Sequence, residues 1–350
     1  MLRTIEYGEI EGNYILVDVR SPGEFMDGTI NGAINIPLFD DEERKIIGTV
    51  YTKESVEKAK RIGLEVASTK LLHIYDEIKE LQKQYDKIIL FCARGGMRSG
   101  ILGSLLSAFG VNTERINEGY KGYRRFVVEN LPKVNESVQY IVLHGNTGVG
   151  KTEILKQLQQ DGFHILDLEG YANHRGSLLG TVGLGKSTSQ KQFESNIFHM
   201  LQKAKGSYVF VEAESKRIGN ATIPDFIFQK MKTGIHIFVQ ADIGFRVELI
   251  VNEYTKLENC NEEIIECLKR LEKYIGAKNI DRYSELVLKS EYYEVVSELM
   301  IKHYDPMYTH GSNKYEYALE VQVVDIKTAT EEIKSWIKTI LLEDFYEFRC

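Results

Sequence analysis

Residues 87–100 read KIILFCARGGMRSG, an apolar run that ends at Cys92 and continues into a glycine-bearing turn and a helical pattern. A continuous apolar run predicts a strand buried on both faces, as in a parallel sheet. A short turn between a strand and a helix can direct its backbone N–H groups towards the cysteine sulfur. The segment therefore predicts an α/β domain in which a cysteine sits in an anion-binding loop at a strand end.

The loop after Cys92 favours a reactive thiol. It consists of Arg94, Gly95, Gly96, Met97 and Arg98. Inward N–H dipoles and nearby arginine charges lower the pKa of a thiol and favour the thiolate. Such a thiolate can attack an oxyanion-bearing donor or hold a terminal sulfur or selenium atom. The alternative is a buried structural cysteine before a turn, which the surrounding Arg-Gly-Gly-x-Arg pattern disfavours.

Outward from this loop, the chain alternates apolar runs and helical patterns. Residues 14–19 (YILVDV) predict a second buried strand, and residues 55–84 predict a helix that breaks near Ser68. The sequence turns polar at 131–137 (LPKVNES), just before a new apolar run. We therefore expect two domains, an α/β domain over 1–134 and a second α/β domain over 135–350.

The second domain opens on a P-loop motif. GNTGVGKT (145–152) matches G-x-x-x-x-G-K-[ST], follows the predicted strand 139–144 and precedes a helical pattern. The expected phosphate-binding residues are Gly145, Asn146, Thr147, Gly148, Val149, Gly150, Lys151 and Thr152. Lys151 would place a positive charge on a phosphate, and the Thr152 hydroxyl could ligate magnesium. A glycine-rich turn without a ligand is the alternative.

Acidic residues follow two further predicted strands of this domain. Asp167 closes the strand 163–167, while Glu212 and Glu214 end or follow the strand 207–212. P-loop proteins place metal- or water-orienting carboxylates at such positions, although acidic residues after strands also cap helices. Arg246 follows the predicted strand 235–240, and it either reaches a phosphate or is a solvated helix residue.

The remainder of the chain is predicted to be helical. Beyond Glu248 the sequence is charge-rich with helical periodicity, and an amphipathic helix is expected from about Thr330. The expected fold class is thus α/β throughout, with a helical C-terminal region.

Composition sets limits on function. The 350 residues are 43% hydrophobic and contain neither a long apolar run nor an apolar leader at the N-terminus, which predicts a cytoplasmic protein without a membrane anchor. Four cysteines without a CxxC pair argue against disulfides and zinc. The net charge of −7 argues mildly against nucleic-acid binding over the whole surface, although a local basic stripe would suffice.

Three segments of the first domain resemble the rhodanese family. They are DVRSPGEF (18–25), GTINGAINIPL (28–38) and FCARGGMRSG (91–100). The resemblance implies that Cys92 is the catalytic cysteine and that Arg20 and Glu24 neighbour it. Phosphatases also use Cys-x5-Arg loops, but the upstream segments favour rhodanese.

Taken over its whole length, the chain resembles the bacterial tRNA 2-selenouridine synthase family. The second half adds LEGYANHRGS (168–177), SQKQFE (189–194), VEAESKRIGNATIP (211–224) and YDPMYTH (304–310). The resemblance implies replacement of sulfur by selenium in 2-thiouridine at the tRNA wobble position. Geranyl diphosphate would first alkylate the sulfur, and selenium from selenophosphate would then displace the geranylthiol. Cys92 would carry selenium as an S-selanyl adduct.

The resemblance leaves the ligand of the P-loop open between geranyl diphosphate and a nucleotide, with or without magnesium. Candidate tRNA or phosphate contacts are His174, Arg175, Lys216, Arg217 and Arg246, with a second basic cluster at Lys121, Arg124 and Arg125. A solvated surface with local ion pairs is the alternative for both groups.

Two other functions compete with this interpretation. One is a rhodanese-type sulfurtransferase coupled to an ATP-using P-loop domain. The other is a sensor or scaffold without catalysis, which the joint presence of Cys92, Arg98, Lys151 and Thr152 disfavours. No obligate protein partner is expected.

Overall fold

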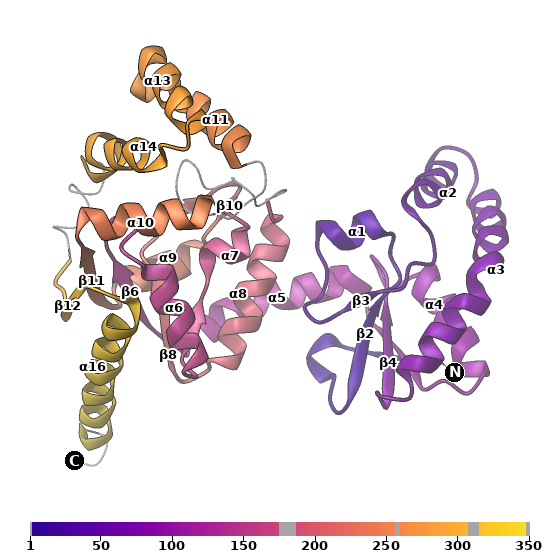
Figure 1. Cartoon of the computed structure of the whole chain (residues 1–350). Helices are drawn as coiled ribbons and strands as arrows, with labels where there is room; N and C mark the ends of the chain where they lie inside the picture. The colour runs from indigo at the N-terminus through magenta and orange to yellow at the C-terminus, as the bar shows by residue number, and fades with distance from the viewer. Residues whose placement is uncertain (1, 175–186, 256–259, 307–314, 348–350) are drawn as a thin grey trace. The chain divides into compact units, whose positions relative to one another are not determined.

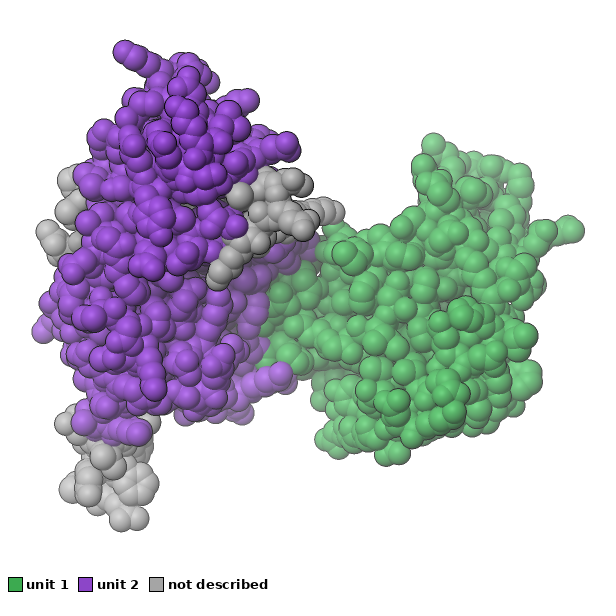
Figure 2. Space-filling model, viewed as in Figure 1, with its two compact units in different colours: residues 1–133, 191–199 green, residues 134–190, 200–350 purple. Residues whose placement is uncertain are grey.

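The computed structural model describes residues 2–174, 187–255, 260–306 and 315–347. The chain forms two compact units (Figure 2), residues 1–133 with 191–199, and residues 134–190 with 200–350. The first unit thus takes in most of helix α8 (Gln190–Lys203), which a single boundary near residue 134 does not foresee. None of the described helices is both long and apolar enough to cross a membrane.

The first unit contains a five-stranded sheet whose strand pairs are all parallel. Its strands, in spatial order, are β1 (Arg3–Ile5), β5 (Thr113–Ile116), β4 (Lys87–Phe91), β2 (Tyr14–Asp18) and β3 (Ile34–Asn35). The strands predicted at 14–19 and 87–92 are therefore confirmed. Ile88 and Leu90 of β4 are fully buried on one side of the sheet, and Ile89 and Phe91 on the other, which explains the unbroken apolar run.

Helices connect or follow these strands (Figure 1). They are η1 (Tyr7–Glu9), α1 (Pro22–Asp27), α2 (Asp41–Lys53), α3 (Val56–Leu81), α4 (Met97–Ala108) and α5 (Gly119–Glu136). The predicted break near Ser68 is wrong, because α3 is continuous and the Ser68 hydroxyl donates to the carbonyl of Glu65 at 2.7 Å. A serine that bonds back to the preceding turn can remain within a helix. The polar segment 131–137 is also helical, up to Glu136.

The second unit contains another all-parallel five-stranded sheet. Its strands, in spatial order, are β12 (Leu319–Val323), β11 (Ile235–Ala241), β6 (Gln139–His144), β8 (Tyr208–Glu212) and β7 (His164–Leu166). The four strands predicted from sequence are confirmed. Strand β12 was not anticipated, because exposed Glu320 and Gln322 alternate with buried Val321 and Val323 at the edge of the sheet. A separate hairpin pairs β9 (Arg217–Ile218) with β10 (Ala221–Thr222).

The helices of the second unit fall into two groups (Figure 1). Those associated with the sheet are α6 (Lys151–Gln160), α7 (Leu168–Ala172), α9 (Asp225–Lys232), α10 (Ile243–Tyr254) and α16 (Ile326–Glu347). Beyond α10 lie α11 (Cys260–Arg270), α12 (Glu272–Ile275), α13 (Ala277–Leu288), α14 (Tyr292–Leu299) and the π-helical turn η2 (Met300–Tyr304). The second group builds a hydrophobic core of its own with α10. The predicted helical C-terminal region is confirmed, and its last helix begins at Ile326 rather than near Thr330.

Two candidate active centres

Cys92 lies at the carboxyl end of β4, the middle strand of the first sheet. Helix α4 begins at Met97, so residues 92–96 form a short loop between strand and helix. Gly95 has a φ of +59°, and a Cβ there would lie 2.9 Å from the backbone nitrogens of Glu118 and Gly119. Only glycine therefore fits the loop at this point. Ligands of open parallel sheets bind at such strand ends.

The thiol of Cys92 is buried and surrounded by hydrogen-bond donors. Burial raises its pKa, but donation from the Ser99 hydroxyl at 3.3 Å, contacts with the backbone of Ser99 and Arg94, and the charge of Arg98 outweigh it. The net result is a pKa of Cys92 below the ordinary value. The prediction of a thiolate-favouring loop is consistent with this geometry.

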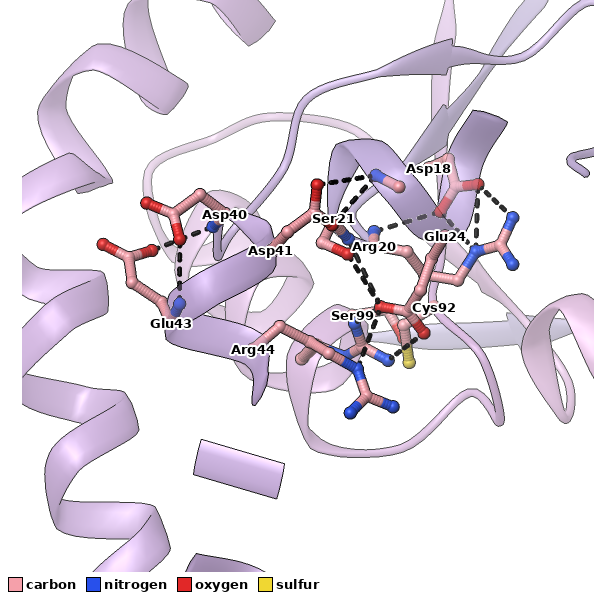
Figure 3. Close-up of polar contacts among 12 residues, drawn as sticks. Asp18, Arg20, Ser21, Glu24, Asp40, Asp41, Glu43, Arg44, Cys92 and Ser99 are labelled. Atoms are coloured by element: carbon pink, nitrogen blue, oxygen red, sulfur yellow. Dashed lines mark hydrogen bonds and ion pairs between the residues drawn. The ribbon is translucent and has the colours of Figure 1, made fainter. Parts of the chain in front are cut away.

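The two arginines of the loop differ in their surroundings. Arg94 is exposed, whereas the Arg98 guanidinium donates to both oxygens of Glu24, at 2.6 and 3.3 Å. Burial raises the pKa of Glu24, but the hydrogen bond and charge of Arg98 hold it below its ordinary value. Figure 3 shows Glu24 reaching from α1 towards the loop. Glu24 is thus a neighbour of the site that orients Arg98.

Arg20 contacts residues that hold the backbone of the Cys92 loop. Its guanidinium forms a buried ion pair with Asp18 at 2.6 Å and donates to the carbonyl of Gly28 at 2.7 Å. It also lies over the ring of Tyr120, 4.2 Å from the centroid, and the Tyr120 N–H donates to the Cys92 carbonyl at 2.8 Å. Arg20 therefore stabilises the backbone behind Cys92.

The second centre lies at the carboxyl end of β6, the middle strand of the other sheet. The glycine-rich loop connects β6 directly to α6, which begins at Lys151. Gly145 has a φ of +147°, and a Cβ there would lie 2.2 Å from the carbonyl oxygen of Val239 in β11. The loop can therefore pass close to the neighbouring strand, which brings backbone N–H groups to the edge of the sheet.

Lys151 and Thr152 face the acidic end of β8. The Lys151 ammonium lies 3.0 Å from the Gly145 carbonyl, to which it donates, and 3.9 Å from a carboxylate oxygen of Glu212. The Thr152 hydroxyl donates to Glu212 at 2.7 Å. The loop thus surrounds the Lys151 ammonium, which loop carbonyls and the Glu212 carboxylate hold in place.

Three carboxyl groups meet beside Thr152. Oxygens of Glu169, Glu212 and Glu214 lie within 4.8 Å of one another. Burial and mutual repulsion raise the pKa of Glu169 to about 9 and that of Glu214 to about 7, while burial raises the pKa of Glu212. Clustered carboxylates with a hydroxyl suit a hard divalent cation. Glu169 was not among the residues predicted from the sequence, where its only signal was its place three residues after the end of β7.

Asp167 and Arg246 have structural roles. Asp167 caps α7 by accepting from the Gly170 N–H at 2.9 Å. Arg246 is 5% exposed, so a solvated helix residue is excluded. It donates to the Thr147 carbonyl at 3.0 Å and binds Asp305 through two further hydrogen bonds. Arg246 therefore links the glycine-rich loop, at Thr147, to Asp305, which follows η2.

The candidate tRNA contacts occupy polar surroundings. Lys216 forms an ion pair with Asp225, and Arg217 donates to the Gly219 carbonyl at 3.0 Å. Burial lowers the pKa of His174, and Arg175 lies outside the described residues.

The second basic cluster is also engaged in local contacts. In the first unit, Arg124 forms an ion pair with Glu194 and donates to the Ser195 hydroxyl at 2.8 Å. Arg125 pairs with Glu118 at 2.6 Å. These contacts position Arg124 against α8.

The fold and the two loops define a rhodanese-like domain followed by an AAA-type α/β domain. A family model for the rhodanese-like domain matches residues 7–126, and one for the tRNA 2-selenouridine synthase AAA domain matches residues 138–344. The second match covers more than half of the chain. The chain therefore belongs to the tRNA 2-selenouridine synthase family.

Two proteins named tRNA 2-selenouridine synthase are similar to this chain over most of its length. The tRNA 2-selenouridine synthase of Pseudomonas putida is 28% identical over 94% of this chain and 95% of its own length. That of Hydrogenovibrio crunogenus is 30% identical over 88% of this chain and 92% of its own length. Among solved structures, a rhodanese-related protein from Thermoplasma volcanium is 24% identical, covers 35% of this chain and 92% of that chain, and has a TM-score of 0.22.

Proposed function

We propose that the protein converts 2-thiouridine at the wobble position of tRNA into 2-selenouridine through an S-geranyl intermediate. Geranyl diphosphate and selenophosphate are the substrates besides tRNA. The observation that carries the proposal is the pairing, in one member of this family, of a cysteine with a lowered pKa and a glycine-rich loop that holds a lysine. One centre suits a selenium anion and the other a diphosphate.

In the first step, the sulfur of 2-thiouridine attacks the first carbon of the geranyl group. The carbon–oxygen bond breaks, diphosphate leaves with the electron pair, and the base loses its N3 proton. Lys151 and the backbone N–H groups of residues 145–152 would stabilise the charge on the departing diphosphate. When bound, a magnesium ion would add charge neutralisation, and Thr152 with Glu212 would hold it.

In the second step, selenium attacks the carbon that carries the S-geranyl group, and geranylthiolate leaves. Geranylthiolate is a better leaving group than the sulfur of unmodified 2-thiouridine, so alkylation makes the displacement easier. Cys92 would hold the selenium as an S-selanyl adduct, stabilised by the Ser99 hydroxyl and by Arg98. Selenium in this adduct is two electrons more oxidised than in selenophosphate. As the S–Se bond to Cys92 forms, the P–Se bond of selenophosphate breaks, water takes the phosphoryl group as phosphate, and a small-molecule disulfide accepts two electrons and becomes two thiols. Two thiols then return these electrons and become a disulfide as selenide leaves the adduct.

Nucleoside analysis tests this function. Purified protein, 2-thiouridine tRNA, geranyl diphosphate, selenophosphate and a small-molecule thiol together with its disulfide should yield 2-selenouridine, with S-geranyl-2-thiouridine as a transient species seen by mass spectrometry. The sulfurtransferase alternative predicts thiosulfate-dependent sulfur transfer with ATP turnover and no geranyl nucleoside. Absence of both modified nucleosides under these conditions would refute the proposal.

A further inference from the structure

A second guanidinium group, that of Arg44 on α2, lies next to the Cys92 loop of the first unit. Its Nε lies 3.5 Å from Glu24 Oε2. The same oxygen accepts the hydrogen bond from the Arg98 guanidinium at 2.6 Å, and the charge of Arg98 acts on the Cys92 thiol. Figure 3 shows the Arg44 side chain reaching towards Glu24. One carboxylate therefore holds two guanidinium groups near the reactive cysteine.

The first turn of α2 is fixed against α1. Asp41 and Arg44 are three residues apart, so they lie on the same face of α2. Asp41 accepts from the Gly23 N–H through both carboxylate oxygens, at 2.9 and 3.1 Å. A Cβ on Gly23 would lie 2.7 Å from Asp41 Oδ1, so glycine permits this approach. The contact sets the position of α2 relative to Glu24, which is also on α1.

A glycine within α2 leaves room for the Arg44 guanidinium. Glycine inside a helix is less stable than alanine, yet Gly48 lies in the middle of α2, one turn beyond Arg44. A Cβ on Gly48 would lie 2.8 Å from Arg44 Nη1. An alanine would therefore displace the guanidinium from the position in which it meets Glu24.

The Arg44 guanidinium is open to a ligand. The Arg44 side chain is 47% exposed, against 19% for Arg98. Among the residues that the structure describes, none accepts a hydrogen bond from Nη1 or Nη2 of Arg44. An exposed ion pair through Nε alone contributes little to stability. A planar group with two such nitrogens suits a tetrahedral oxyanion, which it can bind through two parallel hydrogen bonds.

We propose that Arg44 binds the phosphoryl oxygens of the selenium donor while its selenium faces Cys92. The inference rests on the proposed function for the identity of the donor. Glu24 neutralises one of the two guanidinium charges, and the other remains to offset the Cys92 thiolate and to attract an anionic donor. Arg44 is thus a specificity-determining residue that lies outside the loop motif.

Protection of Cys92 from alkylation tests this assignment on the full-length protein without tRNA. Inorganic phosphate, which matches the phosphoryl group of the donor, should slow iodoacetamide modification of Cys92 in the wild type. Arg44→Ala should need about tenfold more phosphate for the same protection, because one charge-assisted contact is lost. The matched control is Lys45→Ala, at the next position of α2 with a 74% exposed side chain that pairs with Glu42. It should be protected like the wild type.

Gly48→Ala moves the Arg44 guanidinium without removing its charge. The added methyl group would meet Nη1, so phosphate protection of Cys92 should weaken. Because alanine favours the helix more than glycine does, the melting temperature should not fall. A loss of protection in this variant would therefore report the position of the guanidinium and not unfolding.

Selenation kinetics supply a second readout. With S-geranyl-2-thiouridine tRNA as acceptor, Arg44→Ala should raise the KM for selenophosphate about tenfold and change kcat much less, as expected when a contact to the bound donor is lost. A residue that only maintained the structure of the Cys92 loop would lower kcat instead.

Two results would overturn the proposal. One is the absence of phosphate protection in the wild type, which does not depend on the folding of any variant. The other is wild-type protection in both Arg44→Ala and Gly48→Ala. If protection behaves as expected but tRNA is never modified, the anion site stands and the proposed function fails.

Discussion

The Ser99 hydroxyl donates a hydrogen bond to the Cys92 sulfur at 3.3 Å. Ser99 lies in the first turn of α4 and is fully buried, so water cannot replace its hydroxyl easily. Because a donor stabilises the thiolate more than the thiol, this contact is one reason why the pKa of Cys92 is lowered.

Ser99→Ala should therefore raise the pKa of Cys92. The pH dependence of iodoacetamide modification at Cys92, followed by mass spectrometry of the peptide, should shift to higher pH, with slower modification at neutral pH. Thermal melting of the variant checks that the loop is still folded. An unchanged modification profile would show that the backbone and Arg98 alone set the thiol pKa.

Cys92→Ser separates the two centres. A serine hydroxyl is much less nucleophilic and cannot hold selenium as an anion, whereas the glycine-rich loop is untouched. S-geranylation should therefore continue while selenation stops, so that S-geranyl-2-thiouridine accumulates as a late-eluting nucleoside. Normal selenation by this variant with selenophosphate as donor would exclude Cys92 as the selenium carrier.

Lys151→Ala tests the phosphate site. Loss of the ammonium that faces the departing diphosphate should slow S-geranylation by a factor on the order of 10²–10³. The control is Lys156→Ala, on the same helix α6 but exposed and paired only with Glu153 among the described salt bridges, which should geranylate at the wild-type rate. Equal rates for both variants would assign the loop to another ligand.

The carboxyl cluster predicts a pH-dependent stability. The pKa of Glu169 in the folded protein, about 9, lies above the ordinary value of 4.5. The folded state therefore keeps a proton that the unfolded chain has lost, and stability falls as pH rises through this window. Glu169→Gln removes this pH-dependent loss of stability, because glutamine does not titrate. The loss in the wild type amounts to about 1.4 kcal/mol for each unit by which the pKa of Glu169 is raised.

Thermal melting of the wild type and Glu169→Gln across this window, in buffer with a chelator, measures the effect. The melting temperature of the variant should fall less than that of the wild type as pH rises from about 5 to about 9. Parallel curves for the two proteins would show that Glu169 loses its proton as easily in the folded as in the unfolded state.

Association with tRNA should depend strongly on salt. Despite the net charge of −7, we expect a local basic surface that includes Lys216 and Arg217, and phosphate contacts of this kind weaken as salt rises. Filter binding at increasing salt should show a linear fall of log affinity with log salt, with a smaller slope for the double variant Lys216→Ala/Arg217→Ala. Salt-independent binding would contradict this expectation.

Much of the fold could be predicted because the strands carry strong local signals. β2, β4, β6 and β8 are apolar runs buried on both faces, and such runs stand out against polar turns. The edge strand β12 was missed because only alternate residues are buried. The predicted break at Ser68 was wrong because α3 continues through it, with the Ser68 hydroxyl bonded to the Glu65 carbonyl of the preceding turn. Short polar patterns do not show whether a strand lies at a sheet edge or whether a helix continues through a serine.

The sequence by itself determined the two loops, because each strand–loop–helix motif is contiguous and each loop contains a glycine, Gly95 or Gly145, where a side chain would meet neighbouring backbone. Tertiary structure decided what surrounds them. Glu24 reaches the first loop, and Glu169 reaches the second, through the packing of separate elements. The buried position of Arg246 likewise arises from α10, which follows the motif by about a hundred residues. Contacts between distant segments depend on how whole elements pack, which local pattern does not encode.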